Sequence, residues 1–492
     1  MTTATAAVSD RRTPAIGAGP PRGRSQTRHG EGEAPRELHS AELLAHLMRR
    51  AGFGATPEEL ERLVAQGYER TVEALLHPGE VAEAPALDED LVYRYLPDSA
   101  AESRGPAAYW MYRMINTRRP LVEKLTLFWH GLFATARSKV RIWTMAAQHD
   151  TFRRHALDPF ATILLALSRD PAMIIWLDNK DSTKERPNEN YGRELLELFS
   201  MGIGNYTEDD VKASARAFTG WTIKPLLPAQ PYGYFDAEFA YDASIHDDGE
   251  KTFLGETGPW NGDDIIRIIV KQPATARFVA TRLYAFFVSD EPDEAEIQHL
   301  AGVFSRSGGD VRHVLRALFL SGFFRSEQAL FAKIKSPPEL VVGTVRLTGE
   351  YRSPAPGFDR LAAACNYMGQ ELFNPPSVKG WDGGLSWINT GLLMERVNFA
   401  AQELGDPATP GVQSLVQKLA AAAACSPEQV VDEALAFTGP LRASPATRTA
   451  LVDHVSRDGD LRFAAEAERQ TSAERVAELL QLIAASREYQ FA

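Results

Sequence analysis

Two glutamates and an asparagine recur at helical spacing in the segment that follows Asn188. Asn190, Glu194 and Glu197 are separated by four and then three residues, so a helix would place all three on one face. Carboxylates one turn apart on a helix can ligate a divalent metal ion when a histidine faces them. His130, in a separate apolar segment, is the candidate partner. We therefore consider His130, Glu194 and Glu197 as ligands of a divalent metal.

The same side chains also allow acid–base catalysis without a metal. A carboxylate in a pocket with aromatic walls has a raised pKa and can serve as general acid or base. The candidate catalytic residues are Glu194, Glu197, His130 and Arg216. Four of the eight tryptophans fall in the same glycine-containing segments, and together they would line a cleft for sugars or planar rings. The candidate substrate-binding residues are Trp129, Asn190, Trp221, Trp381, Trp387 and Asn389.

A purely structural interpretation of these residues stays open. Arg193 and Glu197 have the spacing of an ordinary helix ion pair. Glu194 could pair with Arg216 from the next helix, and His130 could be a hydrogen-bonded histidine of the core. In that case the polar residues hold helices together and take no part in any reaction.

A second polar stretch contains His149, Asp150, Arg153, Arg154 and His155. Its positive charge could bind an anion. A charge run of this kind is more often a solvated helix face, and we predict such a face here.

Composition and charge exclude several classes of function. The 492 residues carry a net charge of −12, and phosphate recognition requires a basic face, so we expect no nucleic-acid partner. Cys365 and Cys425 are too few for a disulfide framework and are expected to be buried thiols. No stretch approaches the roughly 18 apolar residues of a membrane span. Because no apolar segment of export length follows Arg11 and Arg12, we expect a cytoplasmic protein.

Helical periodicity covers most of the chain and predicts the elements that carry the candidate residues. The histidine falls on a helix over 121–136, and the two glutamates fall on a helix over 189–202. Thr56 and Thr207 are predicted N-caps, and Thr207 forms a capping box with Asp210. The candidate site is therefore expected between helices.

One segment breaks the helical pattern. Residues 224–262 are rich in Pro, Gly, Tyr and Phe, and FDAEFAYD alternates apolar and polar residues, which predicts a β-hairpin. The predicted fold is all-α, an orthogonal helix assembly with this small inserted β-hairpin. We predict a disordered tail over 1–36, a main helical domain over 37–400 and a C-terminal helical subdomain over 401–492.

Several long motifs give the chain a resemblance to a known family. They are HLMRRAGFGATPEELERL, FWHGLF, PNENYGRELLEL, RAFTGW, KSPPELVVGTVR and FNPPSVKGW, in this order. These segments look like the family known as domain of unknown function 1800, over roughly Leu44 to Ala400. The resemblance implies a mostly helical fold, no established activity, and a sulfatase-like protein as a candidate partner. Many relatives look exported and have His where Phe199 stands, and this departure weakens a metal site built on that position.

Two classes of function follow from the sequence. The first is an enzyme with a polar site where Glu194, Glu197, His130 and Arg216 meet in an aromatic-lined cleft. The second is a non-catalytic binding or assembly protein whose Trp-rich loops form a partner interface. A Glu194→Gln variant separates them, because breaking a buried ion pair costs about 3 kcal/mol or more.

Overall fold

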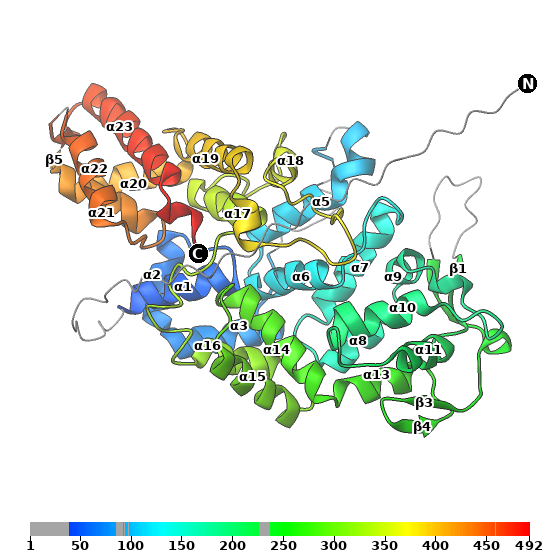
Figure 1. The fold of residues 1–492 in the computed structure, drawn as a ribbon. Coiled ribbons are helices and arrows are strands. Elements are labelled where there is room, and N and C mark those ends of the chain that lie inside the picture. Colours follow the sequence, from blue (N-terminus) through cyan, green and yellow to red (C-terminus); the bar gives the residue numbers. More distant parts are fainter. Residues whose placement is uncertain are drawn as a thin grey trace, which may run out of the picture. The chain divides into compact units, whose positions relative to one another are not determined.

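The computed structural model describes residues 39–84, 92, 94–96, 98–225, 237–422, 424–457 and 459–492, with the backbone alone at 98–103. Residues from His39 to Ala492 form one compact unit. The predicted disordered tail over 1–36 lies outside the described residues. The unit is mainly helical with small β-hairpins, which confirms the predicted fold class (Figure 1).

Local capping signals start the first helices. The Thr56 side chain accepts a hydrogen bond from the backbone N–H of Glu59, as predicted, and Pro57 occupies the first helical position. The helix predicted over 121–136 ends earlier, at Leu132, and the backbone N–H of Arg137 bonds to the carbonyl of Phe373 instead. The elements are α1 (Ser40–Ala51), α2 (Pro57–Gln66), α3 (Tyr68–Leu76), η1 (Pro78–Glu80), α5 (Asp98–Asn116), α6 (Pro120–Leu132) and α7 (Ile142–Arg154).

The helix predicted over 189–202 is present but changes its hydrogen bonding midway. Its first part is α-helical, and the residues from Leu195 to Ser200 form a π-helical turn. The predicted capping box of Thr207 and Asp210 is confirmed. The elements are α8 (Phe160–Ser168), α9 (Pro171–Trp176), η2 (Asn179–Asp181), α10 (Glu189–Glu194), η3 (Leu195–Ser200) and α11 (Glu208–Ala217).

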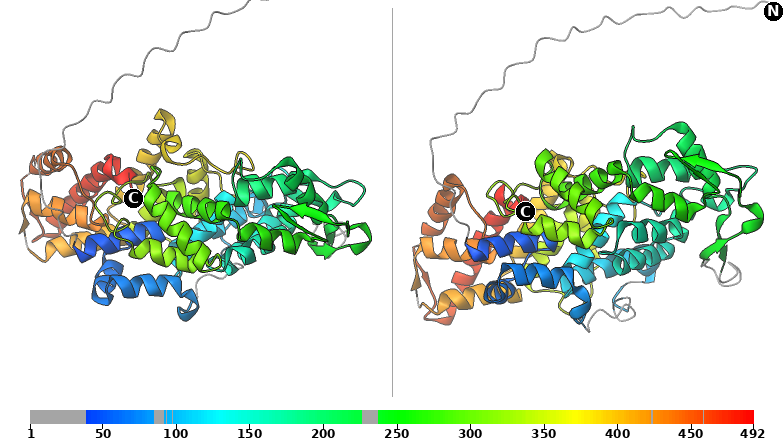
Figure 2. Two further views of the ribbon diagram at one scale, coloured as in Figure 1. Left: turned by 60° about the horizontal axis from the view of Figure 1, so that its bottom comes forward. Right: turned by 90° about the horizontal axis from the view of Figure 1, so that it is seen from below.

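Two antiparallel strand pairs occupy the segment for which one hairpin was predicted. Strands β1 (Trp221–Pro225) and β2 (Ala237–Tyr241) pair, and residues 226–236 between them lie outside the described part. After η4 (Ala243–Ile245), β3 (Lys251–Phe253) and β4 (Glu256–Gly258) form a second pair that contacts α11 (Figures 1 and 2). The turn of this second hairpin is at Leu254 and Gly255, both with positive φ.

Helices resume after the hairpins and continue through the rest of the chain. Both cysteines are buried free thiols, as predicted. The elements are α13 (Gly262–Val270), α14 (Pro273–Phe287), α15 (Glu294–Arg306), α16 (Val311–Leu320), α17 (Pro337–Thr348), α18 (Arg360–Tyr367), η5 (Gly384–Trp387), α19 (Thr390–Leu404), α20 (Pro410–Ala420), β5 (Ala424–Cys425), α21 (Pro427–Phe437), α22 (Pro445–Ser456), β6 (Leu461–Arg462), α23 (Glu466–Ala485) and η6 (Glu488–Gln490).

Helix α6 is shared by the two large apolar clusters of the unit. Leu125 and Phe128 pack with α1, α14 and their neighbours, whereas Leu127 packs with α5 and α17. Because so much of its surface is covered, α6 can carry polar side chains only where partners satisfy them. The predicted domain boundary at residue 400 falls inside α19, and the division remains a prediction. Among the helices that the structure describes, none combines the length and the apolar character needed to cross a bilayer.

Candidate functional site

Helix α10 is held by its apolar face, and this sets the direction of its carboxylates. Tyr191 is buried and its hydroxyl donates to the Ser168 hydroxyl. Gly192 lies so close to α11 that a Cβ there would come within 3.1 Å of the Ala215 backbone nitrogen. Leu195 and Leu196 are fully buried on the same side. The side chains of Glu194 and Glu197 therefore lie at the half-buried edge of the helix.

The two carboxylates have different surroundings. Burial and the negative charge of Glu197 raise the pKa of Glu194, and the positive charges of Lys379 and Arg193 only partly oppose this. Glu197 accepts a hydrogen bond of 3.0 Å from the hydroxyl of Tyr206. The pair thus combines a carboxyl group that holds its proton more strongly than usual with a carboxylate fixed by a hydrogen bond.

The arginines near this helix bind other carboxylates. Arg193 pairs with Glu208 at 2.7 Å and with Glu189 at 3.4 Å, in place of the predicted pair with Glu197. Arg216 pairs with Asp247 of the hairpin segment, at 2.6 and 3.1 Å, in place of a pair with Glu194. The structure does not bring Arg216 to the two carboxylates, because the hairpin supplies a closer partner. Among the residues the structure describes, Glu194 has no ion pair within 4 Å.

His130 is a buried hydrogen-bond acceptor. Its Nε2 accepts the backbone N–H of Phe373 at 3.1 Å, and Phe373 has a positive φ of 64°. Burial lowers the pKa of His130 to about 3, so the ring is neutral at pH 7 and its proton resides on Nδ1. The accepted hydrogen bond fixes the strained start of the loop from Phe373 to Trp381. His130 is therefore placed to position that loop.

His149 lies in the core beside His130, and the predicted solvated helix face at this position is wrong. Its ring centre is 4.5 Å from that of His130 and 4.1 Å from that of Phe373, on which it stacks. Trp110 covers the ring at 4.4 Å. Burial lowers the pKa of His149 well below its usual value, and the nearby positive charge of Arg153 adds to this. Its sequence neighbours are polar, but α7 turns this residue inward.

The proposed metal ligands do not fit a divalent ion. In the described part of the chain, no three His, Cys, Asp or Glu side chains are grouped so that they could hold a metal. The lone pair of His130 Nε2 is already used by the Phe373 N–H. Glu197 is hydrogen-bonded to Tyr206, and Glu194 interacts with Lys379. We derive no metal chemistry from these residues.

The loop from Phe373 to Trp381 joins the histidine to the carboxylates. At Gly380, with φ of 78°, a Cβ would collide with the carbonyl oxygen of Gly131, so this position requires glycine. Trp381 packs edge-on against the His130 ring at 5.3 Å. This close approach fixes the position of Lys379, whose charge acts on Glu194. Lys379 is the site residue that the sequence did not single out, although it lies in one of the noted segments.

The other predicted binding residues do not share a cleft. Trp129 is buried and donates to the carbonyl of Ala156, and Trp221 is buried and donates to Asn261. Trp387 is buried beside Gly369. Asn389 caps α19, and Asn190 is exposed and donates weakly to the carbonyl of Leu177 at 3.4 Å. Of the six, Trp381 is the residue whose ring packs against the ring of His130.

Comparison with known proteins gives one result. The family model described as "Protein of unknown function (DUF1800)" matches residues 46–491, nearly the whole chain. The chain belongs to this family. No curated protein and no solved structure matches this family member significantly. Its function therefore has to be argued from its own side chains.

Proposed function

We propose that this family member is an enzyme that uses Glu194 as a general acid, with Glu197 as the neighbouring anionic carboxylate. The observation that carries the proposal is the electrostatic difference between the two groups: the pKa of Glu194 is raised by burial and by Glu197, whereas Glu197 is held by Tyr206. Pairs of titratable groups in contrasting surroundings are the usual arrangement of acid–base catalysts.

The π-helical turn supports a functional role for this edge. A π turn is rare and is frequently found at functional sites. Here it follows Glu194 directly and contains Glu197. The Ser200 hydroxyl donates to the carbonyl of Leu195, which satisfies one acceptor that the α-helical pattern leaves open. The widened turn alters the angle between the two carboxylates on the helix surface.

The surrounding groups indicate a small polar substrate with a negatively charged part. Lys379 is exposed and its positive charge reaches Glu194, so it is available to an anionic group that enters there. The Tyr206 hydroxyl lies on the other carboxylate and supplies a polar contact. In this proposal the protonated Glu194 gives its proton to the leaving group. The carboxylate of Glu197 takes a proton from the attacking water or alcohol.

A panel of chromogenic substrates tests the proposal. The purified full chain is assayed from pH 4 to 9 with 4-nitrophenyl esters, phosphates, sulfates and glycosides. We expect turnover of at least one class, a loss of about 100-fold or more in kcat for Glu194→Gln, and a higher KM for Lys379→Gln. Glu238→Gln, which removes an exposed carboxylate paired with Lys224, is the control and should retain full activity. Activity of Glu194→Gln equal to that of the wild type would refute the proposal.

A specific feature also favours the second candidate function, a non-catalytic assembly protein. Three large apolar side chains are strongly exposed in one stretch: Tyr367 at 67 %, Leu385 at 81 % and Met394 at 59 %. Gly369 contacts Leu392 in this stretch, so its segments pack on one another. Exposed apolar side chains mark an interaction surface where they form one contiguous patch, and in this proposal the three residues do so. Native mass spectrometry with a sulfatase-like protein tests this: Leu385→Asp should weaken the complex, and Ile203→Asp, at an exposed position elsewhere in the sequence, should not.

A further inference from the structure

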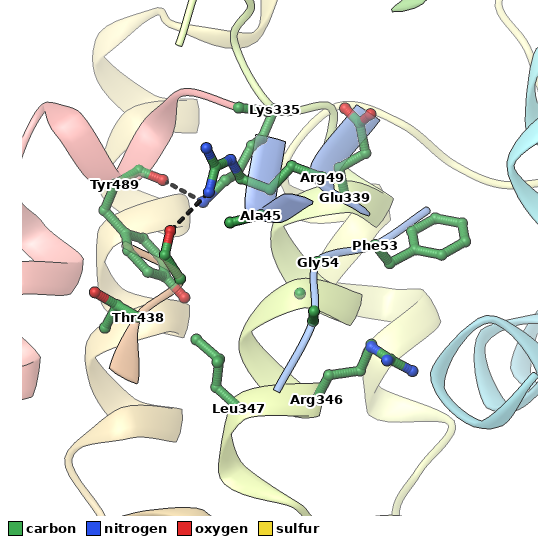
Figure 3. A pocket seen from close by; sticks show the side chains of 14 residues that line it. Ala45, Arg49, Phe53, Gly54, Lys335, Glu339, Arg346, Leu347, Thr438 and Tyr489 are labelled. Atoms are coloured by element: carbon green, nitrogen blue, oxygen red, sulfur yellow. Dashed lines mark hydrogen bonds between the residues drawn. The ribbon is translucent and has the colours of Figure 1, made fainter. Parts of the chain in front are cut away.

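A cavity with no role in the proposed function lies between α1, α17, the turn after α21 and η6. The space between its lining atoms is about 560 Å³ when the open solvent at its mouth is included, and about 40 Å³ of it admits the centre of a water-sized sphere (Figure 3). Arg49 comes from α1, Lys335 precedes α17, and Tyr489 lies in η6.

Two cations at one end of the cavity have no carboxylate partner. Arg49 donates from Nη1 to the carbonyl of Gly439 at 2.6 Å, and its guanidinium covers the Phe331 ring at 4.4 Å. Lys335 donates from Nζ to the carbonyl of Tyr489 at 2.7 Å and lies 4.1 Å from the centre of the Tyr489 ring (Figure 3). All of these partners are neutral, so they satisfy hydrogen bonds without balancing charge.

The acidic groups nearby are each engaged by another cation. Among the described residues, no carboxylate lies within 4 Å of the charged end of Arg49 or Lys335, and the neighbouring ion pairs involve different cations. These pairs are Glu339 with Lys124, Glu59 with Arg346 at 2.6 Å and Glu42 with Arg442 at 3.1 Å. Arg49 and Lys335 are half-buried, and a cation partly removed from water without a counter-charge is unfavourable, so an anion placed between them would be stabilised.

Unused hydrogen-bond donors confirm that the polar end is incomplete. Within the part of the chain that the structure describes, Nε of Arg49 and Nε of Arg346 are buried and have no partner. Buried donors are nearly always paired, so the free Nε of Arg49 indicates that a further acceptor belongs near Lys335, whereas Arg346 lies at the opposite end, beside Leu347 (Figure 3). The terminal nitrogens of both arginines donate to other groups of the protein, so in each guanidinium the Nε–H is the buried donor without a partner.

The charges around Lys335 show how an anion would act on it. Burial, together with the positive charges of Arg49 and Arg396, lowers the pKa of Lys335 to about 7, and Glu339 opposes this only partly. Burial also lowers the pKa of Arg49, to about 9, so it stays charged at neutral pH. An anion between the two cations would favour the protonated lysine.

The other end of the cavity is mainly apolar, and the cation that lies there, Arg346, is paired with Glu59 at 2.6 Å. Phe53, Ala55 and Leu347 contribute to its wall, and Leu347 lies opposite the cations in Figure 3. A Cβ at Gly54 would meet no atom within 4 Å, so the wall is open there. Few donors at one end and apolar walls at the other do not suit a highly charged inorganic oxyanion, which needs many hydrogen bonds.

We infer that this cavity binds a small organic carboxylate, with its anionic head between Arg49 and Lys335 and a short apolar chain toward Leu347. The inference uses no residue of the Glu194 site and is independent of the proposed enzyme function.

Calorimetric titration of the full chain with acetate, butyrate and hexanoate tests the inference. We expect affinity to rise roughly threefold to fourfold for each methylene group that becomes buried. Hexanamide, which has the same chain without the charge, and inorganic phosphate should bind at least tenfold more weakly than hexanoate. Binding of hexanoate at pH 8 should be accompanied by proton uptake, seen as a dependence of the heat on the ionisation enthalpy of the buffer, because Lys335 becomes protonated.

Three variants make the result specific. Lys335→Gln should weaken every carboxylate at least tenfold and remove the proton uptake. Lys418→Gln, at a lysine paired with Glu433 on α20 and α21, is the matched control and should leave affinity unchanged. Gly343→Ala adds one methyl group to the cavity wall, 3.4 Å from the carbonyl oxygen of Phe53, within a helix that accepts alanine. This variant should fold and should bind hexanoate less well than the wild type while binding acetate equally.

Three outcomes overturn the inference. They are binding of hexanamide or phosphate as tight as that of hexanoate, unchanged affinity in folded Lys335→Gln, and absence of any carboxylate binding by the wild type at millimolar concentration.

Discussion

The substitution Glu194→Gln removes one charge from the half-buried edge of α10 and keeps the size of the side chain. Glu194 has no ion pair among the described residues, and its raised pKa means that the folded protein disfavours its ionised form. At pH 7 the neutral glutamine should therefore change the free energy of unfolding by less than about 0.5 kcal/mol. This is far from the loss of 3 kcal/mol or more expected for a broken buried ion pair.

Glu123 provides the contrasting case within the same fold. It is 1 % exposed and accepts hydrogen bonds from Trp110 at 2.9 Å, Arg113 at 3.0 Å and Arg153 at 3.0 Å. Burial alone would raise the pKa of Glu123, but the charges and hydrogen bonds of Arg153 and Arg113 outweigh it and lower the pKa. Glu123→Gln removes the buried counter-charge that Arg113 and Arg153 share and leaves them only the more exposed carboxylates of Glu83 at 3.7 Å and Asp150 at 2.7 Å, so it should cost about 3–5 kcal/mol.

The assay is thermal unfolding followed by circular dichroism. At about 2.1 cal/mol/K per residue, a cooperative unit of roughly 450 residues has an unfolding entropy of about 1 kcal/mol/K, so each kcal/mol shifts Tm by about 1 °C. We expect Glu123→Gln to lower Tm by about 3–5 °C and Glu194→Gln to leave it within about 1 °C. Because the folded pKa of Glu194 is raised, the wild type should gain stability over Glu194→Gln as the pH falls through that pKa.

A Tm loss for Glu194→Gln equal to that for Glu123→Gln would refute the reasoning. It would show that Glu194 is part of a structural ion pair, and the general-acid proposal would lose its basis. A small Tm change with full loss of the chromogenic activity would support catalysis. It would show that the Glu194 side chain is needed for the reaction and not for the stability of the fold.

The remaining predictions concern backbone, proton and thiol chemistry. Gly380→Ala should lower Tm by several degrees and alter the tryptophan fluorescence, because its Cβ would meet Gly131; Gly357→Ala, with a similar φ of 84° and open space, should cost much less. The pKa of Lys335 falls from 10.5 to about 7 on folding, so stability should rise from pH 7 toward pH 10 in the wild type, and this slope should be reduced in Lys335→Met. Burial raises the pKa of the Cys365 thiol, so thiol reagents should modify it only after unfolding, as followed by mass spectrometry.

The sequence predicted helix starts correctly where the hydrogen bonds that define them join residues close in the chain. The predicted N-cap at Thr56 and the predicted capping box of Thr207 with Asp210 are both present, because cap and partner are three residues apart. The helix of His130 ends earlier than its periodicity predicts, since the backbone after it bonds to Phe373, far along the chain. The π turn after Glu194 could likewise not be predicted from the sequence, because it depends on how the buried side of the helix packs.

The sequence identified the segments that form the candidate site, but it did not predict which of their residues contact one another. Glu194, Glu197 and His130 were all singled out, yet Arg216 bonds to Asp247 and His130 to the Phe373 backbone. The cavity residues Arg49 and Lys335 lie in two motifs that carried the family resemblance, and no local pattern marked either as unpaired. Which charges pair depends on contacts between different helices and loops, and the spacing of residues within one helix does not predict those contacts.

The amino-acid sequence by itself determined the helical class, the caps, the position of the strand-bearing segment and the family. These depend on periodicity and on hydrogen bonds within one or two turns. The tertiary structure alone decided which polar groups meet. It left Glu194 beside a second carboxylate and Lys379, made His130 a neutral acceptor, and left Arg49 and Lys335 without a counter-charge. Electrostatic pairing depends on distances between elements remote in the sequence, so it is fixed only when those elements pack.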